Sequence, residues 1–244
     1  MESIEGAVVV VTGGAQGIGF ATCEEVLARG GKVSILDLSE EKGLEALSNL
    51  CKSFDAERVL FLACDVSRRE SVVKALEETR YHFGRLDVLV NNAGIGSGTP
   101  EMVMEVNFHS VVSGSEYGWE MRTRTNGPSV IINVASTAGL VPLEQAPIYT
   151  ASKHAVVGYS RAIARKAKKD SVTVHCMCPA FTDTGLVRKL KDQLRKSTLE
   201  KVGIQEPSVV AEGIVRLMTT EEPLLVACTP ENPFKVLNRN KPKL

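Results

Sequence analysis

The chain alternates between short, continuously apolar segments and longer segments in which apolar residues recur every three or four positions. The apolar segments are rich in Val, Ile and Leu, and the first of them, Ala7–Val11, contains no polar residue. Such runs are typical of strands that are buried on both faces of a parallel sheet. The sequence predicts about seven of these strands, at residues 7–11, 32–36, 58–63, 86–90, 129–134, 172–177 and 224–228.

The amphipathic segments between the strands predict helices, at about 17–30, 40–54, 67–84, 99–124, 147–168 and 208–218. Some boundaries carry their own signal: Ser67 and Glu70 form a capping box, and Thr99 precedes a proline at a first helical position. Alternating strands and helices predict an α/β fold, a doubly wound parallel sheet of the Rossmann type with helices on both faces. At 244 residues, the chain is expected to form a single domain.

The amino-acid composition argues against several classes of binding partner. The chain carries 29 basic and 29 acidic residues, so no nucleic-acid or membrane partner is expected. No apolar run is long enough to span a bilayer, and the first residues lack the pattern of a signal peptide, which predicts a cytoplasmic protein. Six dispersed cysteines are typical of free thiols in a reducing compartment, and no metal site is expected.

A glycine-rich turn, Thr12–Gly19, follows the first predicted strand. Glycines at Gly13, Gly17 and Gly19 would let the backbone approach a pyrophosphate, and the N-terminus of the next helix would favour its charge. A glycine trio alone is weak evidence. The strand before it and the helix after it predict a dinucleotide site.

The second predicted strand ends at Asp37, which lies 18 residues after Gly19. A carboxylate there would accept hydrogen bonds from the adenosine ribose and repel a 2′-phosphate, which favours NAD over NADP. The alternative is an ordinary loop aspartate. No arginine follows Asp37, and Gln16 in the glycine turn is neutral, so we favour the cofactor interpretation.

The candidate chemistry lies between Ser136 and Lys153. Tyr149 and Lys153 are four residues apart, so they share one face of a predicted helix. A phenol has a pKa of about 10, and a neighbouring ammonium favours its ionised form. Ser136 follows a predicted strand, which could present its hydroxyl to Tyr149. The alternative is a solvated helix face, on which Tyr and Lys often occur at this spacing.

Taken together, these motifs resemble the short-chain dehydrogenase/reductase family over about residues 6–228. The motifs are Thr12-Gly13-x-x-x-Gly17-x-Gly19, Asp65, Asn91-Asn92-Ala93-Gly94, Asn107, Ser136, Tyr149-x-x-x-Lys153 and Pro179-x-x-x-x-Thr184. Within the family, the stretches 82–87, 138–140 and 149–154 resemble the NAD-linked 15-hydroxyprostaglandin dehydrogenases. Two departures stand out: Ala180 replaces the family's usual glycine, and Ala146 replaces a glutamine of that branch, with Gln145 one position earlier.

The resemblance implies an NAD-dependent oxidoreductase that interconverts a secondary alcohol and a ketone. In this interpretation, Tyr149 is the general acid/base, Ser136 holds the substrate oxygen, Lys153 lowers the tyrosine pKa and binds the nicotinamide ribose, and Asn107 anchors a water linked to Lys153. Substrate contacts are expected from Ser136, Gln145 and Tyr149. Cofactor contacts are expected from Gly13, Gln16, Gly17, Ile18, Gly19, Asp37, Leu38, Cys64, Asp65, Val66, Asn91, Asn92, Gly94, Tyr149, Lys153, Pro179, Thr182 and Thr184.

Several features allow more than one interpretation. Residues 185–206 combine leucines at helical spacing with basic residues, which predicts either a substrate lid or a surface helix. A lipid-like hydroxy acid such as a 15-hydroxyprostaglandin, a hydroxysteroid or a small alcohol would fit the same residues. Asn107 is either a satisfied core residue or a water ligand, and Asp65 either contacts adenine or only ends a strand.

The resemblance also implies a homodimer or homotetramer, paired through the helices at 99–124 and 147–168. Two rival functions come from other classes. One is a hydrolase, because residues 158–162 loosely match a nucleophile elbow around Ser160, although that serine lies inside a predicted helix. The other is a non-catalytic protein that senses NAD.

Overall fold

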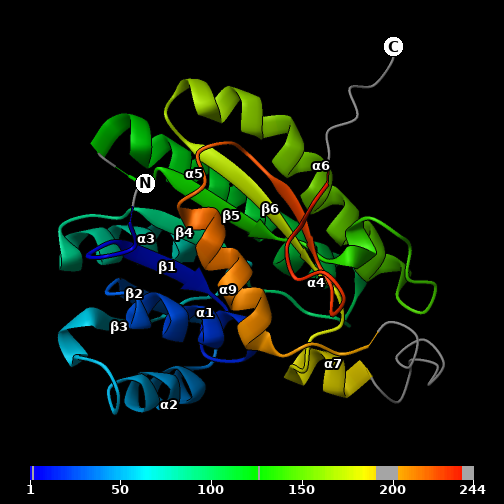
Figure 1. Ribbon diagram of the computed structural model, residues 1–244, viewed down its shortest axis with the longest axis horizontal. Coiled ribbons are helices and arrows are strands. Elements are labelled where there is room, and N and C mark those ends of the chain that lie inside the picture. Colours follow the sequence, from blue (N-terminus) through cyan, green and yellow to red (C-terminus); the bar gives the residue numbers. More distant parts are fainter. Residues whose placement is uncertain (2, 126, 191–202, 238–244) are drawn as a thin grey trace.

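The computed structural model describes residues 1, 3–125, 127–190 and 203–237, which contain one eight-stranded sheet (Figure 1). The strands are β1 (Val8–Thr12), β2 (Lys32–Asp37), β3 (Val59–Ala63), β4 (Val88–Asn91), β5 (Val130–Val134), β6 (Thr173–Pro179), β7 (Leu225–Cys228) and β8 (Lys235–Val236). Their order is β3-β2-β1-β4-β5-β6-β7-β8, and β1 to β7 are parallel. The predicted doubly wound parallel sheet is therefore confirmed. Its strand order reverses between β1 and β4, where ligands of such sheets gather.

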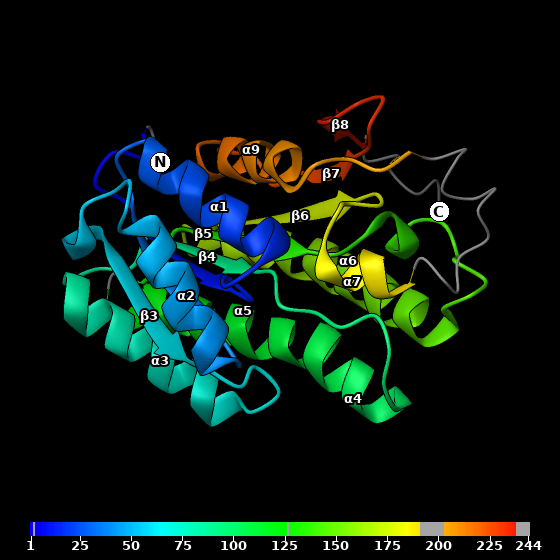
Figure 2. The same cartoon turned by 90° about the horizontal axis from the view of Figure 1, so that it is seen from below.

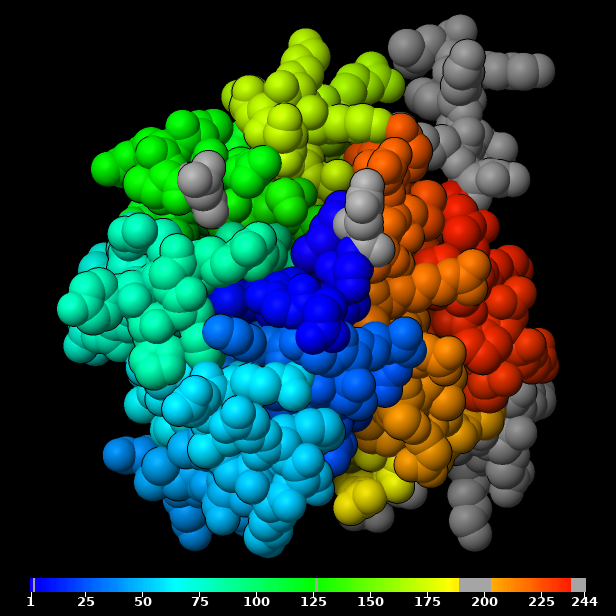
Figure 3. Space-filling model, turned by 60° about the vertical axis from the view of Figure 1, so that its left-hand side comes forward, coloured from blue at the N-terminus to red at the C-terminus, as the bar shows by residue number. Residues whose placement is uncertain are grey.

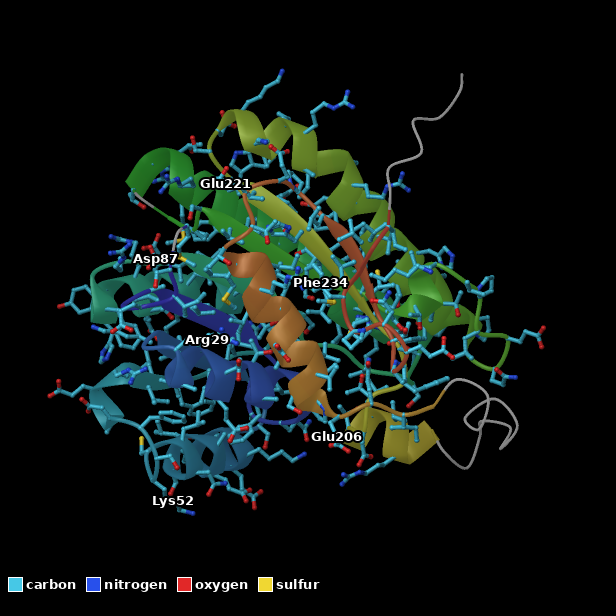
Figure 4. The ribbon with its side chains drawn as sticks, in the orientation of Figure 1. Arg29, Lys52, Asp87, Glu206, Glu221 and Phe234 are labelled. Atoms are coloured by element: carbon cyan, nitrogen blue, oxygen red, sulfur yellow. The ribbon has the colours of Figure 1, made fainter. Side chains whose placement is uncertain are left out.

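The sheet has one strand more than predicted, because β8 is added at its edge beside β7. β8 pairs antiparallel with β7, and Val226 and Val236 face each other in register. Two residues in a polar segment carry no strand signal of their own. The preceding Phe234 packs against the core, and its ring centre lies 4.2 Å from the Arg216 guanidinium, which holds the segment beside the sheet (Figure 4).

The helices are α1 (Gly17–Ala28), α2 (Glu40–Leu50), α3 (Arg69–Phe83), α4 (Pro100–Met104), α5 (Ser110–Thr125), α6 (Pro147–Lys169), α7 (Gly185–Leu190) and α9 (Pro207–Met218). Two short 3-10 turns lie at Ala56–Arg58 and Thr137–Gly139. Helices α1, α2 and α9 cover one face of the sheet, and α3, α5 and α6 cover the other (Figure 2). On the surface, α9 lies beside the N-terminal segments, in orange next to blue in Figure 3.

The two-sided covering explains the continuous apolar strands. In β1, Val9 and Val11 pack toward α1, whereas Val8 and Val10 pack toward α3, and all four are buried. A strand with only one buried face would alternate apolar and polar residues. No helix in the described ranges is long and apolar enough to cross a bilayer.

The predicted helix at 99–124 is interrupted. It consists of α4, a π-helical turn at Glu105–His109, and α5. The expected threonine cap is present, because the Met102 N–H donates to Thr99 Oγ1 at 3.2 Å. The prediction of one continuous helix missed the π turn, because such a turn is a single local insertion inside an otherwise α-helical segment.

The predicted capping box at Ser67 and Glu70 is wrong. Helix α3 begins at Arg69, and its cap residue makes no side-chain hydrogen bond. Ser67 instead donates through its hydroxyl to Asp65 Oδ1 at 2.7 Å, which forms a turn before the helix.

Candidate active site

A cavity of about 160 Å³ lies at the carboxyl ends of the central strands. The structure brings many of the predicted site residues to its lining, although they come from distant parts of the chain. These are Gly13, Gln16, Gly17, Ile18, Asn92, Gly94, Ser136, Tyr149, Lys153, Pro179, Thr182 and Thr184. The other lining residues were not predicted to contact the cofactor or the substrate, because they are small or apolar and lack a chemical signature: Ala93, Val134, Ala135, Ala180, Gly185, Leu186 and Val187.

The glycine turn has the shape of a pyrophosphate cradle. Gly13 has φ +63°, and a Cβ atom there would lie 3.0 Å from Ala93 Cα; at Gly19 it would lie 2.2 Å from the Gly13 carbonyl oxygen. Gln16 at the start of α1 makes no side-chain cap, so the first amides of the helix remain for an anion. These residues fit a bound dinucleotide.

Asn92 lines the cavity and also supports the glycine turn. Its side chain donates to the Thr12 carbonyl at 2.9 Å and to the Gly13 carbonyl at 3.2 Å. The amide therefore ties β4 to the glycine turn and shapes the cradle.

Asp37 lies at the outer end of this cradle. Its carboxylate accepts hydrogen bonds from the Ala15 N–H and the Ser39 N–H, both at 3.2 Å. A carboxylate has about four acceptor sites, so capacity remains for ribose hydroxyls. Lys42 Nζ lies close by, 3.1 Å from Gln16 Oε1, and Leu38 is exposed. Lys42 was missed because its helix, rather than its sequence spacing, brings it to the glycine turn.

Three expected cofactor contacts, Cys64, Asp65 and Val66, lie outside the cavity lining. Asp65 Oδ1 accepts hydrogen bonds from the N–H and the hydroxyl of Ser67 at the end of β3, and its contact with adenine stays a prediction. Cys64 is buried, accepts a weak hydrogen bond from Ser71, and has its thiol pKa raised by burial.

Asn91 does not reach the cavity, contrary to its expected cofactor contact. It is buried, and its amide donates to Asn133 Oδ1 at 2.8 Å and to Ser115 Oγ at 3.2 Å. Asn133 in turn donates to Ser160 Oγ at 2.9 Å. This interior network links β4, β5, α5 and α6. It also overturns the hydrolase alternative, because Ser160 is buried within α6 and has no exposed hydroxyl.

Ser136, Tyr149 and Lys153 meet in the cavity. Ser136 follows β5, and its hydroxyl accepts from the Ala138 N–H at 3.1 Å and donates to the Pro179 carbonyl at 3.4 Å. Tyr149 and Lys153 lie one turn apart near the start of α6. Lys153 Nζ donates to the Val134 carbonyl at 3.0 Å and lies 5.8 Å from the centre of the Tyr149 ring.

The pKa of Tyr149 is raised, whereas the sequence predicted a lowered one. Burial raises this pKa, with a smaller upward contribution from the Cys178 thiol, and the hydrogen bond with Ser136 only partly lowers it. Burial also lowers the pKa of Lys153 to about 8. Burial of the phenol is thus the largest influence on this pKa, and its depression by Lys153 stays a prediction.

Asn107 lies in the π turn and is fully buried. Its Oδ1 accepts from the Ile95 N–H at 2.8 Å, and its Nδ2 donates to the Ile95 carbonyl at 2.9 Å and to Ser152 Oγ at 3.0 Å. These bonds use both amide hydrogens and one of the two acceptor sites of Oδ1, and the water expected at Asn107 stays a prediction. The Asn107 side chain holds the backbone that follows Gly94, on the edge of the cavity.

Two predicted features lie beyond this centre. Gln145 is exposed and is not in the cavity lining, and its expected substrate contact stays a prediction. Of the predicted lid at 185–206, Gly185–Leu190 forms α7, and Leu186 and Val187 line the cavity, whereas residues 191–202 lie outside the described residues.

Comparisons with known proteins agree with this geometry. The family model described as short chain dehydrogenase matches residues 7–195. The chain is 36% identical over 232 residues to 15-hydroxyprostaglandin dehydrogenase [NAD(+)] of Mus musculus, covering 88% of this chain and 86% of the relative. An uncharacterized oxidoreductase of Thermotoga maritima is 38% identical over 200 residues, covering 78% and 77%.

The solved structures show the same architecture. Levodione reductase superposes with a TM-score of 0.84 at 25% identity, covering 94% of this chain and 97% of that one. The protein named gox2181 superposes with a TM-score of 0.82 at 26% identity, covering 91% and 95%. The chain therefore belongs to the short-chain dehydrogenase family.

Proposed function

We propose that the protein is an NAD-dependent oxidoreductase that interconverts a secondary alcohol and a ketone, with Tyr149 as the general acid/base. One observation carries this proposal: Ser136, Tyr149 and Lys153 line the same cavity as the glycine turn. A phenol, a hydroxyl and an ammonium beside a dinucleotide cradle suit proton transfer at a carbon–oxygen bond. Membership of an oxidoreductase family supports the same reaction class.

Each side chain has a separate task. When bound, NAD supplies the acceptor for the hydride that leaves the alcohol carbon. The Ser136 hydroxyl, whose bond to the Pro179 carbonyl is long at 3.4 Å, can turn to the substrate oxygen. Tyr149 takes the alcohol proton in oxidation and returns it in reduction. Lys153, with a pKa of about 8, remains a cation at neutral pH and stabilises negative charge on the phenol oxygen.

The choice of NAD rests on Asp37. Its carboxylate lies at the end of β2 and is fixed by two backbone amides. A 2′-phosphate would meet this negative charge, whereas a ribose hydroxyl could donate to it. The names of the mouse and human 15-hydroxyprostaglandin dehydrogenases, 36% and 35% identical to this chain, specify NAD(+).

We further propose that the substrate is a lipid-like hydroxy acid, such as a 15-hydroxyprostaglandin. The similarity to those dehydrogenases and the apolar side chains of Leu186 and Val187 in the cavity support this class. In this view α7 belongs to a substrate lid. A small alcohol or a hydroxysteroid is the alternative.

The test is NADH formation from NAD by purified protein against 15-hydroxyprostaglandins, hydroxysteroids and short alkanols, with Tyr149→Phe in parallel. We expect turnover of the hydroxyprostaglandins that is lost in the variant. Turnover of hydroxysteroids or short alkanols instead would assign the substrate to that class. Tight NAD binding without turnover of any class would instead favour an NAD-sensing protein.

We also propose self-association, as a homodimer or homotetramer, through α5 and α6. The outer face of α6 exposes the small residues Ala151, Gly158 and Ala162, and nothing lies within 4 Å of a Cβ atom built on Gly158. Sedimentation should show an oligomer, and Gly158→Arg should convert it to a folded monomer. A wild-type monomer would refute this.

We also propose a cytoplasmic location, which fits the six cysteines, because all of them are unpaired.

A further inference from the structure

Gln205 lies behind the wall of the cavity, immediately before α9. It is 5% exposed and does not line the cavity itself. Its backbone pairs with the loop after β6: the Gln205 N–H donates to the Phe181 carbonyl at 3.0 Å, and the Asp183 N–H donates to the Gln205 carbonyl at 2.9 Å. In Figure 4 the next residue, Glu206, marks where this segment passes α7 and enters α9.

The side chain of Gln205 joins three segments. Its Nε2 donates to Thr182 Oγ1 at 3.3 Å and to the Cys228 carbonyl at 3.0 Å, and its Oε1 accepts from the Cys228 thiol at 3.5 Å. The same Cys228 carbonyl accepts from the Ala180 N–H at 2.8 Å. Both amide donors are therefore used to hold the loop after β6 against the end of β7.

These bonds determine how Thr182 can meet a ligand. The Thr182 hydroxyl donates its only hydrogen to the Ala180 carbonyl at 3.0 Å. A hydroxyl has two acceptor sites, and Gln205 occupies one of them, so the other can receive only a donor such as a carboxamide NH₂. Residues 181 and 183 carry the backbone bonds to Gln205, so the Thr182 N–H and carbonyl point away from it.

We propose that Gln205 is a positioning residue for the nicotinamide end of the cofactor, acting through Thr182. Thr182 lines the cavity, and Gln205 orients both its hydroxyl and its backbone. This inference rests on the proposed function, because it assumes that a nicotinamide cofactor binds in the cavity. It assigns a role to a buried glutamine that does not line the cavity.

The experiment compares two ligands by calorimetry: NADH, and ADP-ribose, which lacks the nicotinamide. Gln205→Met keeps the volume and removes both amide donors, and Gln205→Glu keeps the shape and reverses the polarity. We expect both variants to bind NADH about tenfold more weakly, which corresponds to the loss of about one hydrogen bond, and to bind ADP-ribose within about twofold of wild type. Added to Thr182→Val, Gln205→Met should cause little further loss.

Cys228→Ala is the matched control. It removes the weak thiol donor and leaves both amide donors of Gln205 in place, so binding of either ligand should change by less than about twofold. Equal weakening of NADH and ADP-ribose in the Gln205 variants, no weakening at all, or full additivity with Thr182→Val would each overturn the role of Gln205. Wild-type protein that binds neither ligand would overturn the cofactor proposal, and this inference with it.

Discussion

The Lys153 ammonium lies 5.8 Å from the centre of the Tyr149 ring, and its hydrogen bond goes to the Val134 carbonyl rather than to the phenol. Lys153 is only 4% exposed, and burial lowers the pKa of its ammonium to about 8. The protein therefore holds a cation where solvation is poor. Buried charges of this kind are typical of functional sites, where a residue that the reaction needs lowers the stability of the fold.

Lys153→Met should separate the cost of burying this charge from its contribution to catalysis. The pKa falls from 10.5 to about 8 on folding, so below pH 8 the charged lysine destabilises the fold. Allowing for the lost bond to Val134, the variant should be about 2 kcal/mol more stable at neutral pH. Urea unfolding measures this gain, which should shrink as the pH rises from 8 to 10.5 because wild-type Lys153 then becomes neutral. Turnover should fall at least about hundredfold. A less stable variant would contradict this.

Alcohol oxidation should depend steeply on pH. Burial raises the pKa of Tyr149, so the phenol keeps its proton at neutral pH and only a small fraction is ready to act as a base. We expect kcat/KM for oxidation to rise about tenfold per pH unit from neutrality to about pH 8, above which Lys153 loses its charge, whereas ketone reduction stays nearly flat over this range. Steady-state rates in both directions measure this, and Tyr149→Phe should abolish both. An oxidation rate independent of pH would show that the phenol is already ionised.

Asp37→Ser should relax the preference for NAD. The change removes the carboxylate that would repel a 2′-phosphate, and it leaves Lys42 Nζ beside Gln16 as a nearby cation. The ratio of kcat/KM for NAD to that for NADP should fall at least about tenfold. Adding Lys42→Met should then reduce NADP use without affecting NAD. An unchanged ratio in Asp37→Ser would exclude Asp37 as the discriminating residue.

His175 should make the protein sensitive to acid. It is fully buried in β6; its Nδ1 accepts from the Leu224 N–H at 3.1 Å, and its Nε2 has no hydrogen-bond partner within the described residues. Burial lowers its pKa from 6.5 to about 4, with the Thr220 backbone opposing this in part. The neutral form is favoured on folding, so stability is lost as the pH falls from 6.5 toward 4.

The expected loss between about pH 7 and pH 5 is about 2 kcal/mol. Urea unfolding at both pH values, on wild type and His175→Gln, isolates this contribution from that of the carboxyl groups. His82→Gln is the matched control, because His82 lies on exposed surface. Equal pH dependence in wild type and His175→Gln would contradict the prediction.

Asn107→Ala should weaken both stability and turnover. The change leaves the N–H and the carbonyl of Ile95 without their side-chain partner, which should cost about 3 kcal/mol. Ser152→Ala removes one hydrogen bond of Asn107 and the bond that the Ser152 hydroxyl donates to the Tyr149 carbonyl, so it should cost about 2 kcal/mol. Denaturant unfolding compares the two. Equal losses would mean that Asn107 acts mainly through Ser152 rather than through Ile95.

Much of the fold was predictable, because local signals and the global arrangement agree. Apolar runs such as Ala7–Val11 predicted the strands, and they do so because both faces of the sheet are covered. The two-residue strand at Lys235–Val236 carries no such signal; it pairs with β7 beside Phe234, which packs against the core. The prediction of one continuous helix likewise missed the π turn inside it.

The sequence by itself determined the identities and spacings at the site: the glycine turn, Asp37 at a strand end, and Tyr149 one helical turn before Lys153. Only the tertiary structure decided which polar groups face the cavity. It turns Asn91 into the interior, brings Gln205 behind Thr182, and raises the pKa of Tyr149. These outcomes depend on burial and on partners from distant segments, and neither of these is encoded in the local order of residues.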